Sequence, residues 1–172
     1  MKNFKEFIPL IHTKVDPVSY GVYPLSIQTL KNTTVFIAKV KDEKFIVSVG
    51  PTISLEGTEE TINGERVVIG SLNHTNAQVL RSTFPFTAPS RVLSKERSVG
   101  VGDRLGIASP GHIRVFEKYD AYPILAQQSI RELTLTNRTF EDVLDAATFA
   151  VFQEGYKKGF GADGDHLKTE KE

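Results

Sequence analysis

The 172-residue chain contains no cysteine, no tryptophan and a single methionine. Without cysteine it cannot form a disulfide, a thiolate metal site or a cysteine nucleophile. Any metal that it binds must therefore be held by oxygen and imidazole ligands.

The sequence also lacks an excess charge and a long apolar run. It has 21 basic and 21 acidic side chains, so no broad positive field is available for phosphate backbones, and we expect no nucleic-acid partner. No run approaches the ~20 apolar residues that a membrane-spanning helix needs, and residues 1–10 lack the apolar core of a signal peptide. These absences predict a cytoplasmic protein with no membrane partner. Its 40% of apolar residues is ordinary for a folded globular protein.

The first part of the chain has the patterns of antiparallel β-structure. Residues 34–40 and 45–49 are β-branched, apolar-rich runs joined by a polar turn, which predicts a hairpin. Asn63 and Gly64 tolerate the positive φ of a tight turn and predict a second hairpin. A short helix is expected between Asn73 and Phe84, followed by a linker or crossing loop. We therefore assign residues 1–98 to a mainly β region with a short helix and a linker.

After residue 98 strands and helices alternate. Short strands are predicted at residues 104–108, 123–127 and 159–167. Ser109 is expected to cap a helix that runs to about Tyr119, and Thr139 to cap a longer helix that ends near Gly155. Such alternation predicts a parallel sheet, and three parallel strands form an incomplete one. Residues 99–172 are thus interpreted as a partial (β/α) barrel, and the fold class as α/β.

Reacting groups of parallel α/β enzymes lie at the carboxyl ends of the strands. The third predicted strand ends with Asp165, His166 and, shortly after, Lys168. Neutral imidazole is the commonest side-chain metal ligand, and a neighbouring carboxylate can accept a proton. The alternative is a solvated loop whose aspartates cap a helix.

Two further groups of polar residues follow the other predicted strands. Arg104 can bind a substrate carboxylate in bidentate fashion, although an ion pair with Asp103 or a neighbouring acid is an equally good interpretation. Gln127, Gln128, Ser129 and Arg131 can satisfy the hydroxyls and the charge of a sugar acid, while Ser129 with Glu132 can also form a helix-capping box.

Three long segments carry a specific resemblance. They are GVGDRLGIASPGHIRVF, AQQSIRELTLTNRTFEDVLD and FQEGYKKGFGADGDHLKT. In order and spacing they resemble the early part of the tagaturonate/fructuronate epimerase family, most densely over residues 84–169. The resemblance implies a (β/α) barrel of TIM type behind a small N-terminal region, a hexuronate substrate and a divalent metal cation.

Site roles also follow from the resemblance. The GDHL strand end is similar to that of class II ketose aldolases, so Asp165 is expected to accept a proton and His166 to ligate the metal. The two uronates differ at a carbon β to the ketone, which direct enolisation does not make acidic. Retro-aldol cleavage and re-formation of the adjacent carbon–carbon bond is therefore expected, with hydride transfer as the competing mechanism.

The length of the chain is an important departure from this family. A complete barrel takes roughly 250 residues, whereas the residues after Gly102 suffice for two βα units and a third strand at about 30 residues per unit. We expect either a truncated reading frame or one piece of a split protein, inactive by itself; in the second case a complementary chain would be the partner that completes the barrel. Alternatives are an aldolase-like lyase acting on ketose acids and a non-catalytic module that binds sugar acids or proteins.

Overall fold

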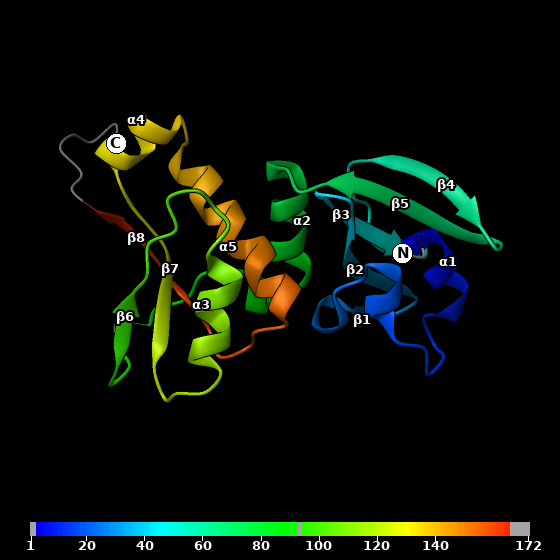
Figure 1. The fold of residues 1–172 in the computed structure, drawn as a ribbon, viewed down its shortest axis with the longest axis horizontal. Coiled ribbons are helices and arrows are strands. Elements are labelled where there is room, and N and C mark those ends of the chain that lie inside the picture. Colours follow the sequence, from blue (N-terminus) through cyan, green and yellow to red (C-terminus); the bar gives the residue numbers. More distant parts are fainter. Residues whose placement is uncertain (1–2, 93, 166–172) are drawn as a thin grey trace. The chain divides into compact units, whose positions relative to one another are not determined.

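A computed structural model describes residues 3–92 and 94–165 of the chain (Figure 1). The chain folds into two compact units, residues 1–79 and residues 80–172. The domain boundary predicted after residue 98 lies where the strands are expected to change from antiparallel to parallel pairing. This boundary stays a prediction. In the described part of the chain no helix has both the length and the apolar character needed to cross a membrane.

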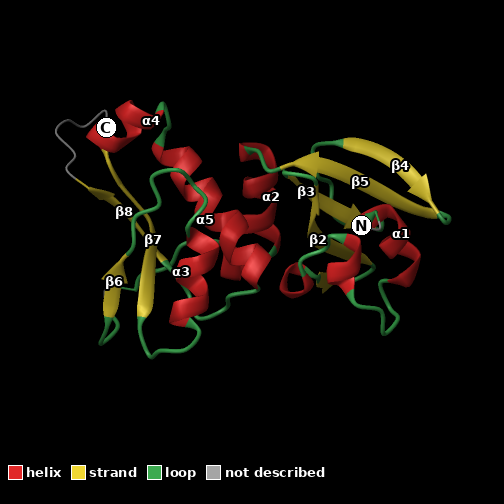
Figure 2. Ribbon diagram, in the orientation of Figure 1, coloured by secondary structure: helices red, strands yellow, loops and turns green. Residues whose placement is uncertain are grey.

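The first unit is built on a five-stranded antiparallel sheet (Figure 2). Its spatial order is β1-β2-β3-β5-β4, with bounds Gln28–Leu30 (β1), Thr33–Val40 (β2), Glu43–Val49 (β3), Thr58–Ile62 (β4) and Glu65–Ser71 (β5). Both predicted hairpins are present. Asn63 and Gly64 have φ values of 53° and 81°, and Ile62 pairs with Glu65 across this turn.

One hydrophobic cluster of the first unit packs against one face of this sheet. Phe7 is 2% exposed and its ring meets that of Phe36, 5.8 Å away, edge to face. Phe7 ends the short helix α1, which the sequence patterns did not predict. The helical segments of the first unit before the sheet are α1 (Phe4–Phe7) and three 3-10 helices, η1 (Ile8–Leu10), η2 (Pro17–Tyr20) and η3 (Pro24–Ser26).

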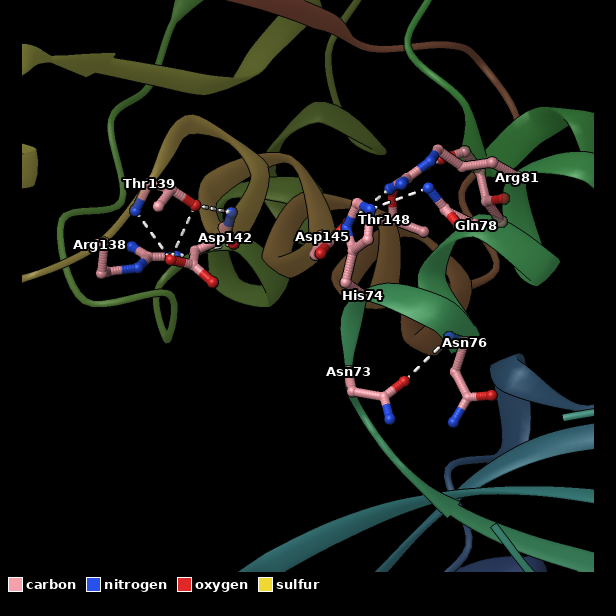
Figure 3. A network of polar contacts seen from close by, with 11 residues as sticks. Asn73, His74, Asn76, Gln78, Arg81, Arg138, Thr139, Asp142, Asp145 and Thr148 are labelled. Atoms are coloured by element: carbon pink, nitrogen blue, oxygen red, sulfur yellow. Dashed lines mark hydrogen bonds and ion pairs between the residues drawn. The ribbon is translucent and has the colours of Figure 1, made fainter. Parts of the chain in front are cut away.

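Helix α2 (His74–Thr83) confirms the predicted short helix. Asn73 caps its first turn, because its Oδ1 accepts a hydrogen bond of 2.9 Å from the backbone N–H of Asn76 (Figure 3). The side chain of Asn76 is fully buried and binds the backbone of the loop before β4 and of the end of β5. Its Nδ2 donates to the carbonyls of Glu56 and Ser71, at 2.9 and 2.8 Å, and its Oδ1 accepts from Glu56 N at 2.8 Å.

The second unit contains a three-stranded parallel sheet in the order β6-β7-β8. Its strands are β6 (Ser98–Gly100), β7 (Tyr122–Ser129) and β8 (Gly161–Asp165), and its helices are η4 (Pro85–Thr87), α3 (Ser109–Phe116), α4 (Ile130–Thr136) and α5 (Phe140–Glu154). The chain is therefore a mixed α/β protein, as predicted. Whether the parallel sheet belongs to a closed barrel stays a prediction.

Helices α3 and α5 pack against each other and against β7 (Figure 1). The apolar face of α5 joins β7 in one cluster, in which Leu125, Val151 and Tyr156 are at most 1% exposed. A bidentate ion pair from Arg114 to Glu154, at 2.9 and 3.0 Å, ties α3 to α5. The sheet is thus supported on this face by two helices that are fixed to each other.

Helix α5 begins as the sequence predicted. The Thr139 hydroxyl accepts from Asp142 N at 3.1 Å, and the Asp142 carboxylate accepts from Thr139 N at 2.7 Å (Figure 3). Further along the helix, Asp145 accepts a hydrogen bond of 2.8 Å from Arg81, which also donates to Thr148. The helix ends at Gly155, whose φ of 59° is left-handed.

Two expectations around the first parallel strand are wrong. Residues 104–108 form a looped turn, and the strand is β6, which ends at Gly100. Ser109 does not cap α3; it is the first residue of the helix, and the helix ends at Phe116 instead of Tyr119. The physical reason for both errors is Asp103, whose carboxylate binds the backbone of the loop and of the first helical turn.

A polar site at the carboxyl ends of the parallel strands

The three parallel strands end at a common edge of the sheet. Strand β7 pairs with β8 so that Gln127 lies opposite Asp163 and Ser129 opposite Asp165. A register shift between Ile124 and Ala126 interrupts the alternation of β7 before this edge. Loops that leave such an edge can vary without disturbing the core, which is why α/β proteins bind ligands there.

The loop after β6 is folded around Asp103. This side chain is 5% exposed, and its carboxylate accepts hydrogen bonds from Ile107 N (3.0 Å), Ala108 N (2.8 Å), Ser109 N (2.7 Å) and Ser109 Oγ (2.8 Å). Burial raises the pKa of Asp103, but the hydrogen bonds from Ser109, Ile107 and Ala108 lower it by more, so the pKa lies below its ordinary value. The carboxylate therefore serves both as the centre of the loop and as the cap of α3.

Arg138 holds the same loop from outside. Its Nη1 donates to the carbonyl oxygens of Asp103 and Arg104, at 3.1 and 3.0 Å, and its Nη2 donates to Asp142 O at 3.0 Å. Because the backbone of Arg104 is fixed by these bonds, the position from which its side chain departs is fixed as well. The loop is a firm support for Arg104.

Arg104 reaches across to the start of the next helix. Its Nε donates to Oε1 of Glu132, and the second carboxylate oxygen of Glu132 accepts from Ser129 N at 3.4 Å. The hydrogen bond from Arg104 is the main reason that the pKa of Glu132 lies below its ordinary value, and burial acts in the opposite direction. Ser129 and Glu132 form the predicted capping box of α4. The ion pair thus joins the loop after β6 to the helix after β7.

The two neighbouring glutamines of β7 have different surroundings. Gln127 is half-buried and its carboxamide covers Gly100 of the adjacent strand, where an added Cβ would lie 2.3 Å from Oε1. Gln128 is 2% exposed, and its Oε1 and Nε2 have no hydrogen-bond partner in the described part of the chain. A buried carboxamide without partners is costly, so Gln128 requires an explanation beyond packing.

Two adjoining pockets share the Arg104–Glu132 ion pair. The first, of about 670 Å³, is lined by the loop after β6 together with Gln127 and Gln128. The second, of about 690 Å³, is lined by α4 residues together with Ser129 and Arg131. Arg104 and Glu132 line both. The structure therefore brings five of the predicted substrate-binding residues to one polar surface, namely Arg104, Gln127, Gln128, Ser129 and Arg131.

Of the predicted catalytic and metal-binding residues, the structure describes only the backbone of Asp165. The backbone of Asp165 lies opposite Ser129, at the same edge as the two pockets. The side chain of Asp165 and the whole of His166 and Lys168 lie outside the described part of the chain. Within residues 3–92 and 94–165, no group of three His, Asp or Glu side chains is placed to hold a metal ion. The described residues therefore do not form a metal centre.

Sequence reasoning missed the structural roles of Asp103 and Arg138. Asp103 lies six residues before the helix that it caps, and no local capping rule covers that spacing. Arg138 had no signal in the sequence, because its three acceptors are backbone carbonyls. The pairing of Arg104 with Glu132 instead of Asp103 follows from the fold, since Asp103 is already occupied.

Fold and site together define a class of protein. The chain has a mixed α/β architecture with two pockets at the carboxyl ends of parallel strands, each lined by several polar side chains, as in α/β proteins that bind small polar ligands. The sequence model of the tagaturonate epimerase family matches residues 23–172. The chain therefore belongs to the tagaturonate epimerase family.

Individual relatives agree with this assignment. The chain is 42% identical over 153 residues to tagaturonate/fructuronate epimerase of Thermotoga maritima, which covers 87% of the chain and 31% of that relative. Crystal structures of fructuronate-tagaturonate epimerase from Cohnella laeviribosi are also similar. The native form superimposes with a TM-score of 0.83 at 43% identity, and a glycerol complex with a TM-score of 0.84 at 42% identity. Each covers 98% of this chain, which spans about a third (33%) of theirs.

Proposed function

We propose that this chain supplies part of the active site of an epimerase that interconverts tagaturonate and fructuronate. Membership of the tagaturonate epimerase family carries the proposal. The amide, hydroxyl and guanidinium groups that line the two pockets support it, because a keto sugar acid presents several hydroxyls and one carboxylate, which need such partners. In this proposal Arg104, Gln127, Gln128, Ser129, Arg131 and Lys168 bind the hexuronate.

The proposed reaction is a retro-aldol cleavage followed by an aldol addition. Asp165 accepts the proton of the hydroxyl on the epimerising carbon, and the bond between this carbon and the one next to the ketone breaks, leaving an aldehyde and an enediolate. Rotation of the aldehyde exposes its opposite face. The bond then re-forms, and Asp165 returns the proton to the new hydroxyl. No atom is gained or lost, as an epimerisation requires.

A divalent cation belongs to the same proposal through His166. When bound, such a cation supplies electrostatic stabilisation of negative charge on substrate oxygens. One imidazole is not a metal site, since catalytic zinc commonly has three protein ligands. We therefore propose that further ligands come from the part of the family's fold that this chain, which spans about a third (33%) of the similar structures, does not cover.

We also propose that the 172-residue chain has no epimerase activity alone, and a chimera tests both statements. This chain would be fused to the remaining two-thirds of the Thermotoga maritima relative. The chimera should interconvert the two uronates, whereas the chain alone should not. Asp165→Asn should abolish turnover of the chimera, while Asp163→Asn, the same change at an exposed residue two positions earlier, should retain it.

Clear outcomes would contradict these proposals. Turnover by the purified chain alone would refute its inactivity, and an Asp165→Asn chimera as active as the parent would refute the role of Asp165. Substrate deuterated at the epimerising carbon separates the mechanisms, because retro-aldol chemistry retains the label without a primary isotope effect. Net release of pyruvate or a triose would indicate an aldolase-like lyase instead.

A further inference from the structure

The Arg104–Glu132 ion pair lies between the two pockets and presents an unused hydrogen-bonding edge. The Arg104 side chain is 72% exposed, and its Nε is bound to Glu132. Among the described residues, none accepts a hydrogen bond from its two terminal nitrogens. A guanidinium group has five N–H donors in a planar fork, and such an edge matches the two oxygens of a carboxylate.

Glu132 is itself held in place. It is the third residue of α4, 25% exposed at its side chain, and the Ser129 N–H binds its second oxygen. Because Glu132 is fixed by the capping box and the Arg104 backbone by Arg138, the guanidinium is restrained at both ends. A restrained guanidinium loses less conformational entropy on binding an anion than a free one.

The surroundings favour a ligand that is anionic at one end and hydroxylated along its length. The second pocket holds two guanidinium groups, of Arg104 and Arg131, against the single carboxylate of Glu132. The first pocket is lined by Gln127 and by Gln128, a nine-tenths buried carboxamide that lacks a partner among the described residues. Amides pair with hydroxyls as both donors and acceptors.

We infer that the two pockets form one site, in which the outer edge of Arg104 binds the carboxylate of a hexuronate and Glu132 is the positioning residue that orients it. The inference rests on the proposed function for the class of ligand and deepens it, because it assigns carboxylate recognition to Arg104. Glu132 does not touch the sugar acid. It acts through Arg104 alone.

Binding measurements on the 172-residue chain test the inference. Calorimetric titrations would compare two sugar acids, tagaturonate and galacturonate, with the neutral ketose tagatose. The chain should bind both uronates about 10-fold more tightly than tagatose, the gain expected for charge-assisted hydrogen bonds. Arg104→Met should remove this preference, and Arg104→Lys, which keeps the charge but not the fork, should retain part of it.

Glu132→Gln is the critical variant, because glutamine preserves a capping box while removing the charge that orients Arg104. It should weaken uronate binding several-fold and leave tagatose binding unchanged. Arg97→Met is the matched control, since it removes another exposed arginine of the same unit and should leave both affinities unchanged. Circular dichroism melting curves would establish that each variant is folded.

The outcomes separate this inference from the proposed function. Equal uronate binding in Arg104→Met and the parent chain would overturn it, as would the absence of any preference for uronates over tagatose. Tighter uronate binding in Glu132→Gln would show that Glu132 competes with the ligand, which also overturns it. If galacturonate binds as tightly as tagaturonate and both depend on Arg104, the inference stands, and only the chimera assay then decides the epimerase proposal.

Discussion

The two sheets of the molecule treat their buried polar groups differently. In the antiparallel unit, buried side chains such as Ser26 and Asn76 are hydrogen-bonded: Ser26 Oγ accepts from Ile37 N at 2.8 Å and donates to Tyr23 O at 2.7 Å. Among the described residues, the buried side-chain atoms without a partner all lie in the parallel unit, on His112, Gln128 and Tyr156. In the described part of the first unit, the buried polar side chains are therefore satisfied within the unit itself.

This difference indicates where the fold gives up stability in favour of ligand binding. An unsatisfied buried polar group costs about 1–3 kcal/mol, and folded proteins contain few of them. Of the three, Gln128 lines a pocket at the carboxyl edge of the sheet, beside the Arg104–Glu132 pair. The unpaired carboxamide of Gln128 lowers the stability of the folded chain. A ligand in the pocket could supply the missing hydrogen-bond partner.

The largest expected effect lies in the first unit, at Asn76. Asn76→Ala should destabilise the unit by about 3 kcal/mol, because three backbone groups of Glu56 and Ser71 lose their partner in a buried place. Hydrogen exchange of the β5 amides would measure the loss. Gln78→Ala, an exposed amide in the same helix, is the control and should change stability by less than about 0.5 kcal/mol. Equal effects of the two substitutions would contradict the view that buried pairing stabilises this unit.

The next effect lies in the second unit, where Asp103 is the best-satisfied polar side chain near the site. Asp103→Ala should destabilise this unit by about 2 kcal/mol, measured by urea unfolding, because it leaves the amides of Ile107, Ala108 and Ser109 without an acceptor. Asp103→Asn keeps one acceptor oxygen, so its free energy of unfolding should lie between those of the parent chain and Asp103→Ala. If both variants unfolded like the parent chain, the loop would not depend on this carboxylate.

The lowered pKa of Asp103 gives the same residue a pH dependence. A carboxyl group whose pKa is lower in the folded than in the unfolded state stabilises the fold when ionised. This contribution is complete above the unfolded pKa of about 3.9 and is lost as the pH falls through the lower folded pKa. Acid unfolding of the second unit should therefore be less steep in Asp103→Asn than in the parent chain.

Gln128 provides the sharpest contrast with Asn76, since both are buried amides. Gln128→Met replaces an unpaired carboxamide by an apolar side chain of similar length, and should stabilise the second unit by about 1 kcal/mol. Thermal unfolding followed by circular dichroism would measure the gain. The same variant should bind uronates less tightly. A loss of stability comparable to that of Asn76→Ala would mean that Gln128 has a partner in solution.

Much of the fold was predictable because its signals are local. The turn at Asn63 and Gly64, the capping boxes that begin at Ser129 and Thr139, and the glycine that ends α5 each depend on residues within four positions of one another. Local hydrogen bonds and φ preferences decide such features in any tertiary context. The alternation of strands and helices likewise sufficed to predict a parallel sheet after residue 98.

The errors came where distant residues decide the structure. The apolar residues Leu105 and Ile107 indicated a strand, yet they are 66% and 73% exposed in a loop that Asp103 and Arg138 hold. In the site, the polar residues of β7 were predicted to lie together. Gln127 and Gln128 point to opposite faces of β7, as successive strand residues do, and which of the two faces is buried depends on the helices and loops that distant residues place there.

The smallest effect concerns the two capping boxes of the second unit and tests whether the box beside the pockets is the weaker. The bonds between Thr139 and Asp142 are 2.7–3.1 Å long, whereas both bonds between Ser129 and Glu132 are 3.4 Å. Thr139→Ala should cost about 1 kcal/mol, and Ser129→Ala about 0.5 kcal/mol less, because longer bonds stabilise a helix end less. Urea unfolding of the two variants gives this difference directly. If Ser129→Ala destabilised the chain as much as Thr139→Ala or more, the cap of α4 beside Arg104 would be as strong as the cap of α5. The weaker hydrogen bonding near the pockets would then be confined to Gln128.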